Sequence, residues 1–144
     1  MAQVPLELRV SLREGSVFYF QERKLTSAEP HYHIVVNDPL SQQVLLLTVV
    51  SSKIDKVKYR RRDCPRTLVE FGPVELPKIL KEPSIVDCND LTKIPLHEFC
   101  ERWERKEIQA FPEDLPVPLR IALRAAIHAS EILSDEIKAL VAKS

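Results

Sequence analysis

The stretch Val44–Ser51, VLLLTVVS, decides the fold class of this chain. Six of its eight residues are apolar, which predicts a strand with no solvated face, buried on both sides within a sheet. Two further strands are predicted upstream, at Ser16–Gln21 (SVFYFQ) after a turn at Gly15, and at His31–Val36 (HYHIVV) before an Asn-Asp-Pro turn. The first half of the chain is therefore expected to build a sheet.

Weaker strand patterns lie at Thr67–Phe71 and Ser84–Cys88. The segment Leu6–Leu12 alternates apolar and polar residues and is interpreted as a strand, with a short helix as the alternative. Many short strands with turn signals and no intervening helices favour a small antiparallel barrel over a parallel βαβ sheet.

The last third of the chain has a helical period. After Pro95, apolar residues recur at i, i+3, i+4 and i+7, namely Leu96, Phe99, Cys100 and Trp103. Beyond Pro118 there is no proline or glycine, and the composition favours helix. Ser134, followed by two acidic residues, is a predicted N-cap, so we expect two helices with a break near Leu133.

These patterns predict one α+β domain over residues 1–144, rich in strands to about residue 94 and helical over about 95–144. No signal peptide and no membrane span is predicted, and three cysteines without Cys-x-x-Cys spacing suggest no disulfide framework, so we expect a cytoplasmic protein without a membrane partner. Phosphate-binding glycine loops and metal-binding motifs are absent from the sequence, so we expect no cofactor and no metal.

The charge is unevenly distributed although the net charge is zero. Residues 53–66 carry seven basic and two acidic side chains, for a net charge of +5, whereas the segments on either side are slightly acidic. This segment, KIDKVKYRRRDCPR, combines cations that pair with phosphate and a tyrosine that stacks on a base. The residues predicted to bind RNA are Lys53, Lys56, Lys58, Tyr59, Arg60, Arg61 and Arg62. A solvated loop, or a loop that binds an acidic protein, is the alternative.

Two pairs of residues are candidates for chemistry. His31 and His33 are two apart on a predicted strand, so both point to one face, and a histidine pair can act as general acid and base. A half-exposed strand end or a core histidine is the alternative. Ser51 and Ser52 follow the most apolar strand, where hydroxyls can bind phosphate oxygens or satisfy the backbone of a turn.

Taken in order, the segments EGSVFYFQ, PHYHIVVN and QVLLLTVVSSKID, and the late segment EPSIVDCN, resemble the PemK/MazF-like toxins of bacterial toxin–antitoxin systems. The resemblance covers roughly residues 14–99 and lies in pattern rather than identity. It implies an SH3-like barrel. Members of that family commonly have an arginine before a proline at the start of the second strand, where this chain has His31 and Tyr32.

The resemblance also implies an activity, which is metal-independent cleavage of single-stranded RNA. The 2′-hydroxyl would attack the adjacent phosphate, with one of His31 and His33 as the base and the other, or a nearby arginine, assisting the leaving 5′-oxygen. Ser51 or Ser52 and the basic segment would hold the phosphate. An antitoxin protein and a homodimer are the implied protein partners. The alternative is a non-catalytic SH3-like module that binds nucleic acid or an acidic protein through residues 53–66.

Overall fold

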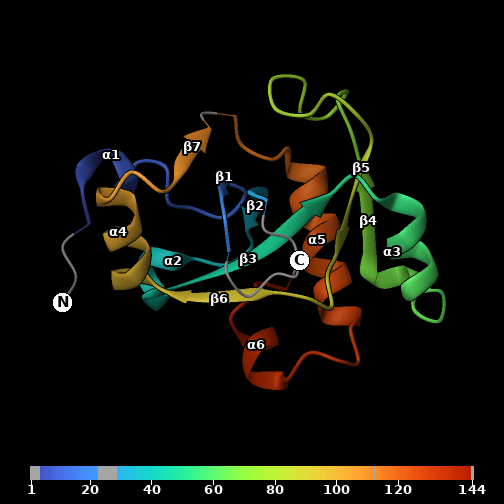
Figure 1. Ribbon diagram of the computed structural model, residues 1–144. Coiled ribbons are helices and arrows are strands. Elements are labelled where there is room, and N and C mark those ends of the chain that lie inside the picture. The colour runs from blue at the N-terminus through green and yellow to red at the C-terminus, as the bar shows by residue number, and fades with distance from the viewer. Residues whose placement is uncertain (1–3, 23–28, 112, 144) are drawn as a thin grey trace.

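The computed structural model describes residues 4–22, 29–111 and 113–143, and in these ranges the chain forms one antiparallel sheet of seven strands with helices on both faces (Figure 1). The strands are β1 (Val17–Phe20), β2 (His31–Val35), β3 (Val44–Ser51), β4 (Leu68–Phe71), β5 (Ser84–Asp87), β6 (Thr92–Pro95) and β7 (Gln109–Phe111). The helices are α1 (Leu6–Arg9), α2 (Pro39–Gln42), α3 (Ile54–Arg60), α4 (Leu96–Glu104), α5 (Val117–Ala129) and α6 (Asp135–Ala139), with a short 3-10 turn at Pro65–Thr67.

Strand β3 is the centre of the sheet, whose order is β4-β5-β3-β2-β1-β7. One edge of β3 pairs with β2, while its other edge pairs with β6 in its first half and with β5 at its end. The five predicted strands at β1 to β5 are confirmed, whereas β6 and β7 were not predicted. Strand β3 is buried from Val44 to Thr48, as its apolar sequence predicted.

Two hydrophobic cores lie on opposite faces of the sheet. On one face, Ile34 and Leu46 pack in a cluster with Leu123 and Ile127 of α5. On the other face, the alternate residues of the same two strands pack against helices α1 and α4. This second core includes Val35, Leu45 and Leu47 from the strands, and Leu8, Leu96 and Phe99 from the helices. The alternation of side chains along a strand thus supplies both cores from the same apolar runs. Figure 1 shows α1 and α4 on one side of the sheet and α5 on the other.

The strand predicted at Leu6–Leu12 is wrong, and the short-helix alternative is confirmed by α1. Leu8 and Leu12, four residues apart, are both buried in the core beneath α4, whereas Leu6 and Val10 are exposed. Spacing of four places two side chains on the same side of a helical turn. The alternating apolar residues of the sequence are therefore a buried pair, Leu8 and Leu12, and an exposed pair, Leu6 and Val10, on a helical turn and not on a strand.

The predicted closed barrel is not seen, because the sheet is open. Within the described residues, β4 and β7 each pair with a single strand and lie at opposite ends of the strand order. Helix α5 contacts β4 and the 3-10 turn that precedes it. A helix packed on the sheet buries its apolar face, so closure is not needed to shield the core.

The C-terminal helices follow the predicted pattern. Helix α4 buries Leu96, Phe99 and Cys100. After α5, the chain breaks and restarts at α6, where the Ser134 hydroxyl accepts a hydrogen bond from the Ile137 amide at 3.3 Å, which confirms the predicted N-cap. In the sequence, strand β7 comes between α4 and α5, so the C-terminal part that was predicted to be helical also contributes a strand to the sheet. None of the helices in the described ranges has the length and apolar character needed to cross a membrane.

Candidate functional site

A groove of about 890 Å³ opens beside helix α3, between that helix, the ends of β2, β3 and β5, and the segment that follows β4. It brings together seven of the eleven residues that the sequence analysis selected. These are His31, Ser51, Ser52, Lys53, Lys56, Tyr59 and Arg60. His33, Lys58, Arg61 and Arg62 do not line it.

The pairing of β2 with β3 explains why the histidine and the serines meet. His33 lies opposite Val49 in this antiparallel pair, so the register leads His31 toward Ser51 two residues further along. Both residues are half-buried. The Ser51 hydroxyl accepts a hydrogen bond from the Lys53 amide at 3.1 Å, which shapes the turn into α3, and Ser52 is exposed to solvent. Ser51 therefore serves the backbone of the turn and still lines the groove.

His33 lies in the core instead of the groove. Its side chain is fully buried and its ring stacks on Phe20 with centroids 4.0 Å apart. Nδ1 lies 2.9 Å from the carbonyl oxygen of His31, and because a carbonyl only accepts, Nδ1 carries the proton of the neutral ring. Burial lowers the pKa of His33 to about 4. The ring is neutral near pH 7 and has no direct path to a ligand in the groove.

The prediction that the basic segment 53–66 is a loop is wrong, because residues 54–60 form helix α3. Ile54 is partly buried and Val57 is buried three residues later, which gives the segment one inward face. Asp55 lies in the first turn and Lys58 and Arg60 lie in the last turn, as the helix dipole favours. The positive charge is thus carried on a helix beside the groove and not on a loose loop.

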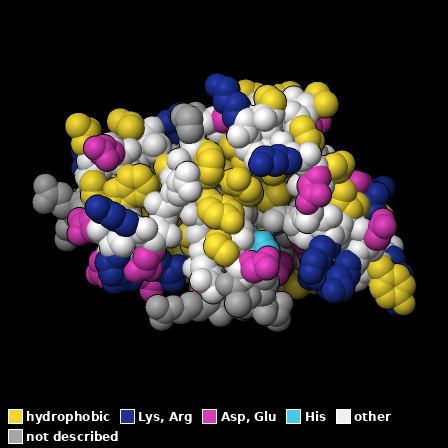
Figure 2. Space-filling view, turned by 45° about the horizontal axis from the view of Figure 1, so that its top comes forward, with side chains coloured by type: hydrophobic (Ala, Val, Ile, Leu, Met, Phe, Trp, Pro, Cys, Tyr) yellow, Lys and Arg dark blue, Asp and Glu magenta, His cyan; other side chains and the backbone are white. Residues whose placement is uncertain are grey.

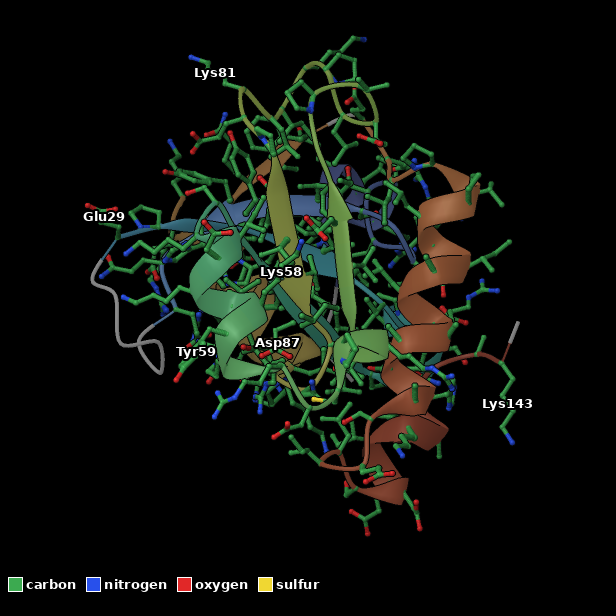
Figure 3. The ribbon with its side chains drawn as sticks, turned by 90° about the vertical axis from the view of Figure 1, so that its right-hand side faces the viewer. Glu29, Lys58, Tyr59, Lys81, Asp87 and Lys143 are labelled. Carbon is green, nitrogen blue, oxygen red and sulfur yellow. The ribbon has the colours of Figure 1, made fainter. Side chains whose placement is uncertain are left out.

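Several cations of this segment already have partners. Lys58 forms an ion pair with Glu70 at 2.9 Å, and Arg62 lies over the Tyr59 ring at 4.4 Å from its centroid. Figure 3 shows Lys58 between α3 and the neighbouring strands, with Tyr59 at the outer side of the helix. By contrast, Lys53 and Lys56 make no ion pair within the described residues, and both line the groove. Lys81, in the segment that follows β4, also lines the groove and makes no ion pair within the described residues, so these three lysines are the cations of the groove best placed to receive a phosphate.

Asp87 at the end of β5 anchors the C-terminal end of α3 (Figure 3). Its carboxylate accepts hydrogen bonds from Arg61 at 2.8 Å and from Arg60 at 3.1 Å. It also accepts hydrogen bonds from the backbone amide and the side chain of Asn89. Burial alone would raise the pKa of Asp87, but these hydrogen bonds together lower it below its ordinary value, so the carboxylate stays charged at neutral pH.

A buried polar network extends from Asp87 to the end of α5. The Asn89 side chain donates to Thr67 at 2.7 Å, and the buried Ser130 hydroxyl donates to Asn89 at 2.6 Å. Ser130 also accepts from the amides of Ile132 and Leu133, which start the turn toward α6. Because each group has a partner, the network fixes the wall of the groove against the helical end of the chain.

Tyr19, Tyr32 and Asp87 are among the groove residues that the sequence analysis did not select. Tyr19 and Tyr32 lie directly opposite each other on β1 and β2, and their ring centroids are 4.8 Å apart. Burial, and the neighbouring Tyr19, raise the pKa of Tyr32, so its phenol is neutral at physiological pH. Two tyrosines on adjacent aromatic strands were visible in the sequence, but only the register shows that they are neighbours.

Apolar, basic and acidic side chains all line the groove. The space-filling view shows hydrophobic side chains gathered in the middle of one face and Lys and Arg side chains at its right, over α3 (Figure 2). Four carboxylates also line the groove, namely Glu29, Glu82, Asp87 and Asp90. No cluster of three or more histidine, cysteine, aspartate or glutamate side chains suited to a metal ion occurs in ranges 4–22, 29–111 and 113–143.

In comparisons with known proteins, no protein-family model and no curated protein sequence matches this chain.

Proposed function

We propose that this protein binds single-stranded RNA in the groove beside α3 and cleaves it without a metal ion, as the resemblance to the PemK/MazF-like toxins implies. One observation carries the proposal, which is that the groove brings His31 together with Ser51, Ser52 and the cations Lys53 and Lys56. A histidine can accept the proton of the RNA 2′-hydroxyl, and cations beside it can balance the charge of the phosphate that the hydroxyl attacks.

His31 has the role of general base in this proposal, and His33 is no longer assigned one. The 2′-hydroxyl gives its proton to His31 as its oxygen forms a bond to phosphorus, and the bond from phosphorus to the 5′-oxygen breaks. Water in the open groove supplies the proton that the departing 5′-oxygen needs. The products are a 2′,3′-cyclic phosphate and a 5′-hydroxyl.

The negative charge on the phosphate is balanced by the cations of the groove. Lys53 and Lys56 are exposed and close in sequence to the two serines, whose hydroxyls can donate to phosphate oxygens. Arg60 is about half exposed, and its partner Asp87 retains Arg61 and Asn89 if Arg60 turns to the ligand. Arg60 is therefore a further phosphate contact that the network can release.

The other parts of the proposal come from the resemblance alone. A relationship to SH3-like barrels would make the open sheet a variant of that fold. An antitoxin that covers the groove and a homodimer are expected protein partners of such a toxin.

Cleavage is tested by incubating the purified protein with a mixed single-stranded RNA in the presence of a chelator and analysing the fragment ends. We expect 2′,3′-cyclic phosphate ends from the wild type and a loss of at least about 100-fold in rate for His31→Ala. His33→Phe is the matched variant, since it removes the histidine that lies outside the groove, and it should keep cleaving. Intact RNA with the wild-type protein would refute the catalytic part of the proposal.

A second candidate function is binding of RNA without cleavage. The observation that favours it is that only one histidine of the pair lines the groove, which leaves no second histidine as the acid. RNA that stays intact but binds with an affinity that falls steeply with salt would support this function over the nuclease.

A further inference from the structure

We propose that Tyr19 and Tyr32 form a stacking site for a base of single-stranded RNA at the strand end of the same groove. This inference rests on the proposed function, because it assigns the base subsite of a groove whose cations hold the phosphates. It is independent of whether the bound RNA is cleaved.

The two tyrosines form a preorganised aromatic pair. They are partners in the register of β1 and β2, with ring centroids 4.8 Å apart and ring planes inclined by 48°. Phe111 of β7 supports the pair, since its ring meets Tyr32 edge-on with centroids 5.3 Å apart. Three adjacent strands therefore hold the rings in place, and a rigid aromatic surface loses little entropy when a ligand binds.

The rings lie at the end of a sheet face that is otherwise covered. Tyr19 and Tyr32 share their face with Val17 and Ile34, which are fully buried in the core beneath α5. Toward the groove the two tyrosines are only half-buried, and both line it. Val50, Ile79 and Leu80 are further apolar residues of the groove lining. Because these three residues are buried, the apolar surface that a ligand can reach at the strand end is that of the two tyrosines.

The same groove also has lysines in its lining, together with the four carboxylates named above. Lys53 and Lys56 lie at the start of α3, and neither has an ion-pair partner within the described ranges. A nucleotide has a flat, weakly polar base at one end and a charged phosphate at the other. A groove that has both aromatic surface and lysines without an ion pair matches that division, whereas the aspartate and glutamate side chains of an acidic peptide would pair with the lysines alone.

Tyr59 is less suited to this role, although it is the tyrosine that the sequence pattern selected. Its side chain projects from α3 and is 70% exposed. The guanidinium of Arg62 covers one face of its ring at 4.4 Å from the centroid. No neighbouring aromatic ring is found for Tyr59 in the part of the chain that the structure describes. The strand pair therefore provides the better stacking surface.

The test measures binding of a fluorescent 2′-O-methyl RNA of about eight nucleotides, a length within the range of known single-strand binding sites. Its methylated 2′-oxygen cannot attack the phosphate, so the probe stays intact. A second probe has the same sugar-phosphate length but abasic sites. The proteins are the wild type, the leucine variants Tyr19→Leu, Tyr32→Leu and Tyr59→Leu, and the variants Tyr19→Phe and Tyr32→Phe as matched controls that keep the rings. The midpoint of urea unfolding, followed by far-UV circular dichroism, verifies that each variant remains folded under the binding conditions.

We expect each leucine variant to bind the RNA roughly 5- to 100-fold more weakly, while the phenylalanine variants stay within about twofold of the wild type. The wild type should bind the abasic probe as weakly as the leucine variants bind RNA. Equal affinity of the wild type for both probes would overturn the inference, as would a larger loss from Tyr59→Leu than from either strand tyrosine. A wild-type protein that binds neither probe would refute the proposed function itself.

Discussion

Replacing His33 with phenylalanine should remove a large part of the acid sensitivity of this protein. The His33 side chain is fully buried, it stacks on Phe20, and burial lowers its pKa from 6.5 to about 4. The unfolded chain takes up a proton as the pH falls through about 6.5, whereas the folded chain does so only near 4. The free energy of unfolding therefore falls as the pH decreases through this interval.

The size of the effect follows from the two pKa values. At about 1.4 kcal/mol for each pH unit, a shift from 6.5 to about 4 corresponds to on the order of 3 kcal/mol of lost stability once the pH is below 4. About 2.5 kcal/mol of that is expected at pH 4.5. The charge of His31 also lowers the pKa of His33, whereas its backbone carbonyl raises it by accepting the hydrogen bond. Glu22 and Arg102, which form an ion pair with each other at 3.3 Å, act on this pKa in opposite directions.

The assay is urea unfolding followed by far-UV circular dichroism at pH 7.5 and pH 4.5. Between these two conditions the wild type should lose about 2 to 3 kcal/mol more stability than His33→Phe, because other titrating groups contribute to both proteins alike. His97→Ala is the control, since it removes an exposed histidine of α4 and keeps His33, and it should follow the wild type. Equal losses in the wild type and His33→Phe would refute the burial argument.

Two further stability predictions concern residues that position the groove and the sheet. Asp87→Asn should lower the free energy of unfolding by about 2 kcal/mol at pH 7, because it removes the buried negative charge that binds Arg60 and Arg61. This difference from the wild type should shrink as the pH falls through the lowered pKa of Asp87, because the wild-type carboxylate then becomes neutral as well. Urea unfolding at pH 7 and pH 3 measures this, and an unchanged variant would contradict it. Gly15→Ala should cost about 1 to 2 kcal/mol, because the residue has a φ of +92° and its new Cβ would lie 2.6 Å from Cδ of Arg120. Thermal unfolding compares it with Gly72→Ala, whose Cβ meets its nearest atom at 3.4 Å, and an equal effect of the two substitutions would contradict the strain argument.

The sequence determined the regular elements that rest on strong local patterns. The strands at β1, β2 and β3, the stripe of α4 and the N-cap of α6 follow from apolar periodicity and capping residues, which act over a few neighbouring positions. The α1 segment was misread, because two buried leucines at a spacing of four also fit an alternating pattern. The seven-residue helix α3 was missed, because its many charges hid its single inward face.

The candidate site depended more on tertiary structure. The sequence analysis selected eleven residues, of which seven line the groove. It paired His31 with His33, whose burial becomes visible only when Phe20 lies against its ring. The sequence analysis also treated the three arginines at 60–62 as equivalent, whereas Asp87, which is distant in sequence, forms ion pairs with Arg60 and Arg61.

Local sequence thus determined which segments are strands and helices and where positive charge is concentrated. Tertiary structure alone decided that the sheet stays open, which histidine faces the groove, which cations remain unpaired within the described residues, and that Tyr19 and Tyr32 are neighbours. The physical reason is that periodicity and capping are properties of adjacent residues, whereas burial, ion pairing and ring stacking join residues from separate strands and helices, whose approach depends on how the whole chain packs.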